Sequence, residues 1–521
     1  MNRIRGGRRK RRQARVGAPD LALTPNAGMA AITELCDRLG VIEALDAAVG
    51  RVKQRNRGYG AGELLTGIAA AQLAGEDFLV GLDRQRADTA GQRLAPVPGL
   101  SSTTAAGLAR RITAGQWAAV EHGVAAVTGR MLALLPAPRA AALTEGPVTI
   151  DLATTDVEVY GRKKRGVAYN HQGQRVGRPH VATWAETETV LAADLGDGTD
   201  DPRATAPGLL RRALAGLPER ARAGGRVAMR ADAGYFAGQL ARAAHDEHIA
   251  FAIGAKRIAP LWRLLDGISD DDWTGAIDMD GAQVTVASYR PDWWPASTSL
   301  LTRRVKLAPE QVSADPRSRR RRTLHPGQRA LPIPELASAD AIYGYSFILT
   351  NLDVSSPGKA AAAEHWYRHR TTIENIFRDS KHGAALRHLP SGYVKVNTAW
   401  MWGTLLAASM AGWLHQLTAA TRGQTILDGH GVRGGKAMIA TLRRRLIAIP
   451  GRLVRHAGAL ILRLPPCQAC SPRSSPACGP SPRCPDHPAR KAQPEPRKPR
   501  TRRDTRAPSL LAHRQRRRED Q

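Results

Sequence analysis

The feature that most constrains the fold is a change in hydrophobic spacing at Pro147. From residue 28 to residue 135, apolar side chains recur three and four positions apart, which is typical of amphipathic helices. After Pro147, short apolar runs predict strands and helices in the order βββαβαβ. We expect the strands at 147–153, 180–186, 189–195, 226–232 and 249–256, and the helices at 204–217 and 237–246. This order predicts an α/β domain with a mixed sheet and helices on its faces.

Two later stretches complete the predicted architecture. Three strand-like runs between residues 281 and 352 interrupt the alternation and predict a β-rich insertion. Helical spacing resumes at Lys359 and is expected to last until about Leu464. The chain would therefore return from the insertion to complete the α/β domain. Beyond Pro465 the sequence is rich in Pro, Arg, Ser and Cys without periodicity, which predicts disorder.

Charge limits the partners that such a chain can bind. The sequence holds 77 Lys and Arg against 46 Asp and Glu, a formal net charge of +31. Residues 1–20 contribute +7 and residues 465–521 contribute +9, which leaves +15 for the body between them. A basic body with basic tails is the electrostatic pattern of a polyanion binder, most simply a nucleic-acid-binding protein. A solvated basic surface that reflects a high arginine content is the alternative.

The helical region carries features suited to DNA. Its first two helical stretches are joined by the basic segment 51–60, and a Ser-Ser-Thr cap at 101–103 precedes a helix that ends in Arg110 and Arg111. Basic loops and helix termini are common contacts to the DNA backbone. We therefore expect residues 28–142 to form a helical DNA-binding domain.

Several protein classes are excluded. Five cysteines in 521 residues, four of them between positions 467 and 484, cannot form the disulfide framework of a secreted scaffold, so a cytoplasmic location is expected. Residues 396–421 lack Lys, Arg, Asp and Glu, but their polar side chains predict a buried core helix and no membrane contact. No P-loop, G-x-S-x-G or H-E-x-x-H motif occurs.

The strongest local signal lies in residues 364–381. If this segment is one helix, Tyr367, Arg370, Glu374 and Lys381 share one narrow face. A carboxylate flanked by two cations and a phenol suits a site that holds a divalent metal and a phosphate together. Such a metal needs further carboxylates, and the sheet offers them at the ends of two predicted strands: Asp151 and Asp232.

These residues resemble a known family. The pattern Tyr-x2-Arg-x3-Glu-x6-Lys, the βββαβαβ order and the β insertion are similar to those of the DDE transposases of bacterial insertion sequences, in the branch with that signature. Residues 156–195 and 230–236 look like the first catalytic block and the second-aspartate block of that branch. The resemblance covers roughly residues 28–464. It implies a ribonuclease H-like catalytic domain with two Mg²⁺ or Mn²⁺ ions bound by an Asp, Asp, Glu triad.

The family's roles carry over residue by residue. Asp232 would be the second catalytic and metal-binding carboxylate and Glu374 the third. Tyr367, Arg370 and Lys381 would hold phosphates near the transposon end.

The first carboxylate is where the sequence departs from the family. The family block usually reads Asp-x-Asp, whereas here Asp151 is followed by Leu152 and Ala153. We expect Asp151 to act as the first metal ligand, with Asp156 as the fallback. An alanine at 153 leaves open that this copy is impaired.

Further DNA contacts are predicted outside the triad. The basic loop Arg162, Lys163, Lys164 and Arg165 and the run from Arg317 to Arg322 could bind phosphates, with mobile charged loops as the alternative. Trp293 and Trp294 in the insertion could stack on a base, with core packing as the alternative.

The prediction as a whole is a DNA transposase that cleaves transposon ends and joins them to target DNA. We expect a cytoplasmic, nucleoid-associated protein that acts on DNA as a homo-oligomer. The alternatives are a catalytically silent DNA-binding remnant and a metal-dependent nuclease or phosphatase of the same fold. The expected parts are a disordered basic arm (1–27), the helical DNA-binding domain (28–142), a catalytic domain in two pieces (143–256 and 353–464), the β-rich insertion (257–352) and a disordered basic tail (465–521).

Overall fold

The computed structural model describes residues 17–54, 57–307, 342–422 and 436–466. All of these belong to one compact unit within residues 1–477. The predicted arm up to residue 16, the arginine run 317–322 and the tail from residue 467 onward lie outside the described residues.

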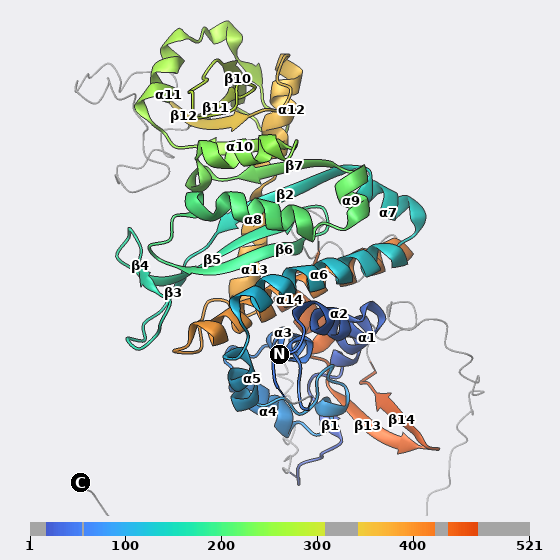
Figure 1. Cartoon of the computed structure of the whole chain (residues 1–521). Coiled ribbons are helices and arrows are strands. Elements are labelled where there is room, and N and C mark those ends of the chain that lie inside the picture. The colour runs from blue at the N-terminus through green and yellow to red at the C-terminus, as the bar shows by residue number, and fades with distance from the viewer. Residues whose placement is uncertain (1–16, 55–56, 308–341, 423–435, 467–521) are drawn as a thin grey trace, which may run out of the picture. The chain divides into compact units, whose positions relative to one another are not determined.

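A mixed sheet forms the centre of the described chain (Figure 1). Its main path runs β3-β5-β2-β7-β8-β12-β11-β10-β9, and β4 and β6 also pair with β5. The strands of the first half are β2 (Pro147–Thr154), β3 (Val157–Glu158), β4 (Ala168–Tyr169), β5 (Arg175–Trp184), β6 (Thr189–Asp197), β7 (Arg226–Ala231) and β8 (Ala250–Ala255). Strands β2, β7 and β8 are parallel, whereas β5 is antiparallel to β2 and to β6. The predicted strands and helices appear in the predicted order, and the two-residue strands β3 and β4 and the short helix α9 (Glu219–Gly224) are additional.

The inserted strands continue this sheet. They are β9 (Thr274–Gly275), β10 (Ala282–Ala287), β11 (Ser299–Leu307) and β12 (Ile342–Thr350). Strand β12 pairs antiparallel with β8, through Phe347 opposite Ala255 and Thr350 opposite Ala252. The insertion is therefore joined to the first half of the sheet by backbone hydrogen bonds.

Helices pack on the faces and along the edge of the sheet. Helix α8 (Pro202–Gly216) packs on β5 and β6, and α10 (Gly238–Asp246) packs on α8 and β8. Two shorter helices, α9 (Glu219–Gly224) and α11 (Ala259–Leu264), flank β7 and β8 in the sequence. In Figure 1, α8 lies in front of the sheet and α13 (Thr371–His382) lies behind it, where α13 contacts β2.

The N-terminal region is helical, as predicted. Its helices are α1 (Met29–Leu39), α2 (Val41–Val49), α3 (Ala61–Ala74), α4 (Gly81–Ala87), α5 (Ser102–Ala109), α6 (Ala114–Leu134) and α7 (Ala137–Thr144). The spacing of residues 29–49 is continuous, but Gly40 takes φ 55° and ends α1, because only glycine adopts this left-handed conformation at little cost. At α5, the Ser101 side chain accepts a hydrogen bond from Thr104 N and caps the helix as expected.

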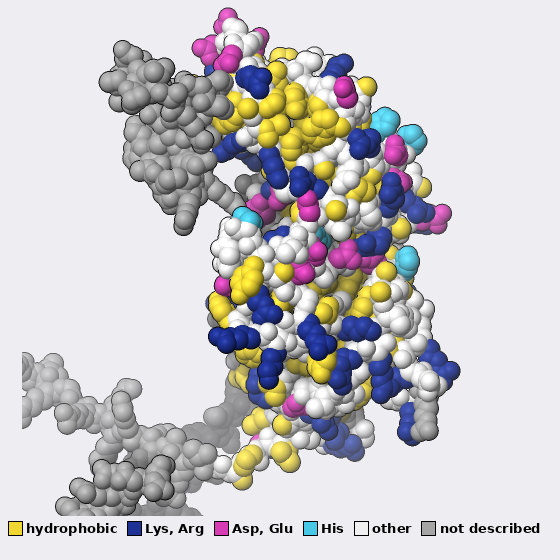
Figure 2. Space-filling view, turned by 60° about the vertical axis from the view of Figure 1, so that its left-hand side comes forward, with side chains coloured by type: hydrophobic (Ala, Val, Ile, Leu, Met, Phe, Trp, Pro, Cys, Tyr) yellow, Lys and Arg dark blue, Asp and Glu magenta, His cyan; other side chains and the backbone are white. Residues whose placement is uncertain are grey.

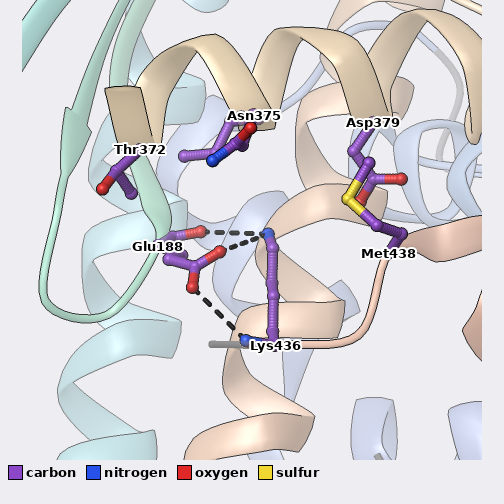
Figure 3. Close-up of a pocket in the computed structure, with 7 residues that line it drawn as sticks. Glu188, Thr372, Asn375, Asp379, Lys436 and Met438 are labelled. Carbon is purple, nitrogen blue, oxygen red and sulfur yellow. Dashed lines mark hydrogen bonds and ion pairs between the residues drawn. The ribbon is translucent and has the colours of Figure 1, made fainter. Parts of the chain in front are cut away.

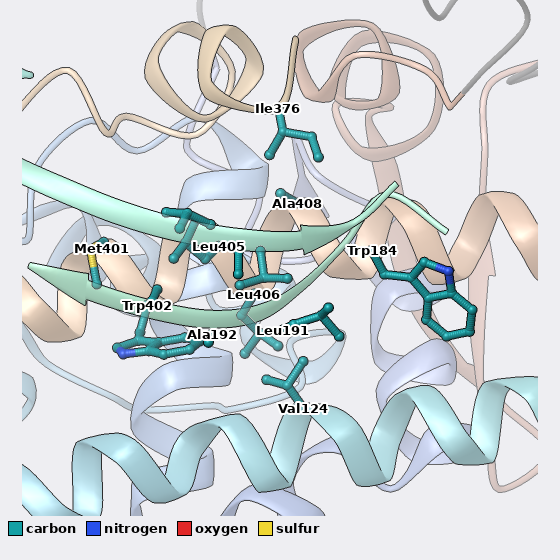
Figure 4. Packing of buried hydrophobic residues seen from close by; sticks show 14 of the residues in the cluster. Val124, Trp184, Leu191, Ala192, Ile376, Met401, Trp402, Leu405, Leu406 and Ala408 are labelled. Carbon is teal, nitrogen blue, oxygen red and sulfur yellow. The ribbon is translucent and has the colours of Figure 1, made fainter. Parts of the chain in front are cut away.

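Helix α14 (Val394–Arg422) joins the helical region to the sheet. It packs on α3, and its Ser409 Oγ accepts a hydrogen bond from Val190 N on the edge strand β6. Its tryptophans are buried, and Figure 4 shows Trp402 in the same core as Val124 of α6 and Leu191 of β6. The predicted core helix is confirmed. In the part of the chain that the structure describes, no helix is long and apolar enough to cross a membrane.

The C-terminal end of the described chain corrects one prediction. Residues 451–463 were expected to be helical but form the hairpin β13 (Gly451–His456) and β14 (Ala459–Arg463), and β13 also pairs with β1 (Leu23–Thr24). The turn residues Ala457 and Gly458 both have positive φ, which matches the right-handed twist of a tight hairpin. The run of Leu, Val and Ile on either side of this turn favours strands.

Candidate active site

The predicted single helix at 364–381 is two helices. Helix α12 (Pro357–Arg368) ends before Arg370, and Arg370 is the N-cap residue of α13. Between the two helices the backbone makes hydrogen bonds to the residue three positions earlier, as in a 3₁₀ turn: His369 N donates to Trp366 O, and Arg370 N donates to Tyr367 O. The prediction that four side chains share one continuous helical face is therefore wrong, although all four remain close to the sheet or to one another.

A buried arginine explains this break. Arg230 on β7 donates from Nη1 to the carbonyl oxygen of Trp366 at 2.5 Å, and its guanidinium lies 5.1 Å from the Trp366 ring centroid. In an unbroken helix that carbonyl would accept from Arg370 N. Arg230 and His369 N donate to it instead, so α12 ends there without leaving this acceptor unpaired.

Arg230 also engages the predicted first ligand. Its Nε and Nη2 donate to the two oxygens of Asp151 at 2.6 and 2.8 Å, and both side chains are almost fully buried. Burial raises the pKa of Asp151 to about 6, while the charge and hydrogen bonds of Arg230 oppose that rise. Arg230 was not predicted as a site residue. The sequence did carry one indication, because Arg230 stands two residues before Asp232 and so lies on the same face of the strand.

The ladder between β2 and β7 shows what lies beside each acid. Asp151 is opposite Arg230, and Leu152 is opposite Ala231. Continuing this register by one residue sets Ala153 beside Asp232. Because side chains alternate along strands, Ala153 and Asp232 lie on the face that carries the Asp151–Arg230 pair. Ala153 is 3% exposed, so the position nearest to Asp232 on β2 is an apolar, buried methyl group.

Asp232 and Glu374 have freer carboxylates. Asp232 follows β7, and its Oδ1 accepts a hydrogen bond from Gly234 N at 2.8 Å. Glu374 lies in the first turn of α13 with 55% of its side chain exposed, and its Oε1 accepts from Arg370 Nη2 at 2.9 Å. Both therefore keep oxygens that a further partner could reach.

Arg370 lies among the three acids. Burial lowers its pKa, but the phenol of Tyr367 and three nearby carboxylates raise it, and the net pKa is raised. The three carboxylates are Asp232, Glu374 and Asp151. The charges of all three predicted acids therefore act on the Arg370 guanidinium, and Glu374 also forms an ion pair with it.

Tyr367 and Lys381 are held by the sheet. The Tyr367 hydroxyl donates to Ala231 O at 3.2 Å and has room there because Gly254 has no side chain; a Cβ at Gly254 would lie 2.5 Å from it. Lys381 Nζ donates to Asp156 O at 2.7 Å, and burial lowers the pKa of Lys381.

The fallback acid has another role. The Asp156 carboxylate accepts from Arg178 Nε at 2.7 Å and from Asn170 Nδ2 at 2.8 Å. These bonds tie the start of the loop after β2 to β5. Burial acts against the ionised form, but the two donors outweigh it and lower the pKa of Asp156.

The other predicted DNA-contact residues divide into exposed and packed side chains. Arg162, Lys163 and Arg165 are exposed, whereas Lys164 is partly buried and donates to Leu389 O. In the insertion, Trp293 is 43% exposed and Trp294 is buried against Phe236. Trp294 therefore packs in the core, and only Trp293 keeps an accessible ring.

The acids do not fit a site for two metal ions as they stand. Mg²⁺ requires near-octahedral oxygen coordination. Asp232 and Glu374 can supply oxygens, but both oxygens of Asp151 are bound to Arg230, and position 153 has none. Among the described residues, no group of three His, Cys, Asp or Glu is arranged to hold a metal. The arrangement therefore supplies two of the three carboxylates that the family resemblance implies.

A small cavity of about 50 Å³ lies on another side of α13 (Figure 3). Asp379 lines it, and Ile376, another lining residue, lies about 200° round the helix from Glu374. Asp379 Oδ1 accepts from Ile439 N, whereas its buried Oδ2 has no hydrogen-bond partner. Across the cavity, Lys436 Nζ lies 3.8 Å from a carboxylate oxygen of Glu188. This cavity is separate from the group of acids around Arg370.

Comparison with known proteins decides the family. The family described as "Transposase DDE domain group 1" matches residues 8–314 and 335–473, which is most of the chain. The chain belongs to the DDE transposases. Among solved structures, this DDE transposase is similar to the piggyBac transposase in a synaptic complex with hairpin DNA, with a TM-score of 0.39 and 9% sequence identity over 81% of this chain and 79% of that chain. No curated protein sequence matches it.

The family match confirms the recognition made from the sequence. In this DDE transposase, Asp151 lies within β2, Asp232 follows β7, and Glu374 lies at the start of α13. The residues with accessible carboxylates are Asp232 and Glu374, and Asp151 is a buried partner of Arg230.

Proposed function

We propose that this chain is a DNA transposase with a ribonuclease H-like catalytic domain, which cleaves transposon ends and joins them to target DNA. The observation that carries the proposal is the family match together with the charges of Asp232 and Glu374, both of which act on Arg370. The mixed strand directions in β6-β5-β2-β7-β8 and the intervening helices support the catalytic fold. We further propose that residues 28–142 bind DNA and that the protein acts as a homo-oligomer.

The proposed roles follow from the chemistry of each side chain. Arg370 is a planar donor that can hold a phosphate oxygen when it releases Glu374. Tyr367 lies next to it, whereas Lys381 lies at the other end of α13 and would hold a phosphate there. Asp232 and Glu374 would supply two of the carboxylates for Mg²⁺ or Mn²⁺. The third carboxylate is lacking, because both oxygens of Asp151 are bound to Arg230.

A second candidate function has its own supporting observation. The Asp151–Arg230 pair is buried, and alanine stands at 153 beside Asp232. These facts favour a transposase copy that binds DNA but cleaves it poorly. A metal-dependent nuclease or phosphatase of the same fold has no separate observation in its favour.

One assay distinguishes the two candidates. A labelled duplex that carries the terminal sequence of the element is incubated with Mn²⁺ and the full-length protein, its Glu374→Gln variant or its Ala153→Asp variant. Cleavage by the parent that Glu374→Gln abolishes supports an active transposase with Glu374 as one of its catalytic acids. Binding without cleavage by the parent, with cleavage gained in Ala153→Asp, supports the impaired copy. A parent that neither binds nor cleaves such DNA rejects both.

A further inference from the structure

Three segments that are far apart in the sequence meet on one surface. The loop at 159–166 packs on residues 387–395 through Lys164 Nζ, which donates to Leu389 O, and through Arg165 N, which donates to Gly392 O at 3.2 Å. Residues 387–395 in turn reach the end of α5, where Lys395 Nζ donates to Arg110 O at 3.3 Å. These contacts join the loop after β3 to the helical region.

The joined surface is basic, and three acids border it: Glu158 accepts from Tyr160, Asp77 pairs with Arg387, and Asp83 accepts from Ser102. None of its three segments, 102–111, 159–166 and 387–395, contains Asp or Glu. We call its exposed cations the basic bridge: Arg110, Arg111, Arg162, Lys163, Arg165 and Lys395. Across the described ranges none of these six forms an ion pair with a carboxylate. Cations gathered without acidic partners are the pattern of a surface that binds a polyanion.

Aromatic rings lie among these cations. The Arg110 guanidinium lies 5.0 Å from the ring centroid of Tyr393, and the Tyr393 side chain is 51% exposed. At the two ends of the basic loop, Tyr160 is 85% exposed and Tyr169 is 68% exposed. Phenol rings and guanidinium groups together suit the sugars, bases and phosphates of nucleic acid. Figure 2, which brings forward the side of β3, β4 and α5 in Figure 1, shows Lys and Arg side chains spread over the lower half of this face with few acids among them.

Helix α13 connects the candidate site to the chain that leads into the basic loop. Glu374 lies in its first turn, and Lys381 in its last turn donates to Asp156 O at the start of the segment that leads into the basic loop. Seven residues of helix separate Glu374 from Lys381, a rise of about 10 Å.

We propose that the basic bridge binds the phosphate backbone of duplex DNA just inside the transposon end. This inference rests on the proposed function and adds to it a surface shared by the helical region and the catalytic domain. Because such contacts are to phosphates, they position the duplex and carry no sequence preference of their own.

The test is DNA binding by the full-length protein as a function of salt, measured by fluorescence anisotropy without divalent metal. The probe is a labelled duplex with the element's terminal sequence, and an unrelated duplex is the comparison. The variant combines Arg110→Gln, Arg111→Gln and Lys395→Gln. We expect affinity for both duplexes to fall about 10- to 100-fold, and the slope of log affinity against log salt to become shallower by about 2 to 3.

The matched control removes the same charge elsewhere. It combines Arg220→Gln, Arg222→Gln and Arg226→Gln, three exposed arginines near α9. Arg226 pairs with Pro147 at the start of β2, whereas the basic loop follows the other end of that strand. We expect the control to keep its affinity within about twofold, since the salt slope depends on the phosphates that a protein contacts.

The outcomes separate this inference from the proposed function. Equal losses in the bridge variant and the control, or no loss in either, overturn the basic bridge while DNA binding by the parent stands. A parent that binds neither duplex overturns the proposed function as well. If the bridge variant melts at a lower temperature than the parent, a second variant with Arg162→Gln, Lys163→Gln and Arg165→Gln replaces it, since these exposed loop side chains form no ion pair in the described chain. Unchanged binding in that variant also counts against the inference.

Discussion

Asp151 and Glu374 each lie beside an arginine, but the two pairs are built in opposite ways. Asp151 is fully buried and shares both of its oxygens with Arg230, which is itself 3% exposed. Glu374 is more than half exposed and shares one oxygen with Arg370. A buried pair cannot lose a partner without leaving a charge in a low-dielectric interior, whereas an exposed carboxylate can exchange its partner for water, a cation or another donor. Asp151 is therefore suited to stabilising the fold, whereas Glu374 is suited to a functional role.

The largest effect should come from breaking the buried pair. We expect Asp151→Ala to lower the free energy of unfolding by about 3–5 kcal/mol, because it leaves the Arg230 guanidinium buried and unpaired. Urea unfolding followed by circular dichroism measures this loss. The double variant Asp151→Leu with Arg230→Met should recover much of the stability, since it removes both charges. A loss of less than about 1 kcal/mol in the single variant would show that the pair is not a structural element.

The next largest effect should come from supplying the missing acid. We expect Ala153→Asp to raise the rate of Mn²⁺-dependent end cleavage by roughly 100-fold or more. A further carboxylate beside Asp232 would help to bind the metal ions, and bound ions stabilise the charge of the transition state by several kcal/mol. Binding of Mn²⁺, followed by calorimetry, should also become tighter. Ala153→Asn is the matched control, as it adds nearly the same volume without the charge. Equal cleavage by the two variants would contradict the expectation.

Another buried acid, Asp379, extends the comparison to the pH dependence of stability. Burial raises the pKa of Asp379 to about 6, and its Oδ2 has no hydrogen-bond partner. Because the folded pKa lies above the ordinary value of 3.8, the folded state binds the proton more tightly, and the stability from this group is lost as pH rises through about 6. Asp379→Asn removes this dependence. The free energy of unfolding of the variant minus that of the parent should be larger at pH 7 than at pH 4 by on the order of 2 kcal/mol. Urea unfolding of both proteins at the two pH values measures this difference. Parallel curves for the two proteins across this range would rule out the titration.

The smallest effect should come from the exposed pair. We expect Glu374→Gln to change the free energy of unfolding by less than about 1 kcal/mol, since exposed ion pairs contribute little. The same urea experiment measures it beside Asp151→Ala. A loss as large as that of the buried pair would mean that Glu374 has a structural role, which would remove the contrast between the two acids.

Much of the fold could be predicted because its signals are local. The βββαβαβ order follows from spacing within each segment, and it agrees with β2 through β8 in type and order. The core position of α14 likewise follows from its own composition. The pairing of β12 with β8 could not be predicted, because backbone hydrogen bonds between strands about a hundred residues apart depend on the whole sheet.

The candidate site could be predicted only in part for the same reason. Asp232 could be predicted because it ends a predicted strand, and Glu374 because it belongs to the pattern Tyr-x2-Arg-x3-Glu-x6-Lys. Helical spacing in residues 364–381 gave no sign of the break, because it arises from Arg230, which lies more than a hundred residues away and binds Trp366 O. The partner of Asp151 is likewise set by strand register, which a single sequence does not contain.

The pairing of β1 with β13 has a consequence for the synthesis of the protein. Residues 23 and 24 find their strand partners at 451 and 452, so this pairing cannot form until synthesis has passed residue 452. Strand β1 is thus made long before its partner, and a chain that stops between residues 24 and 451 leaves β1 without it.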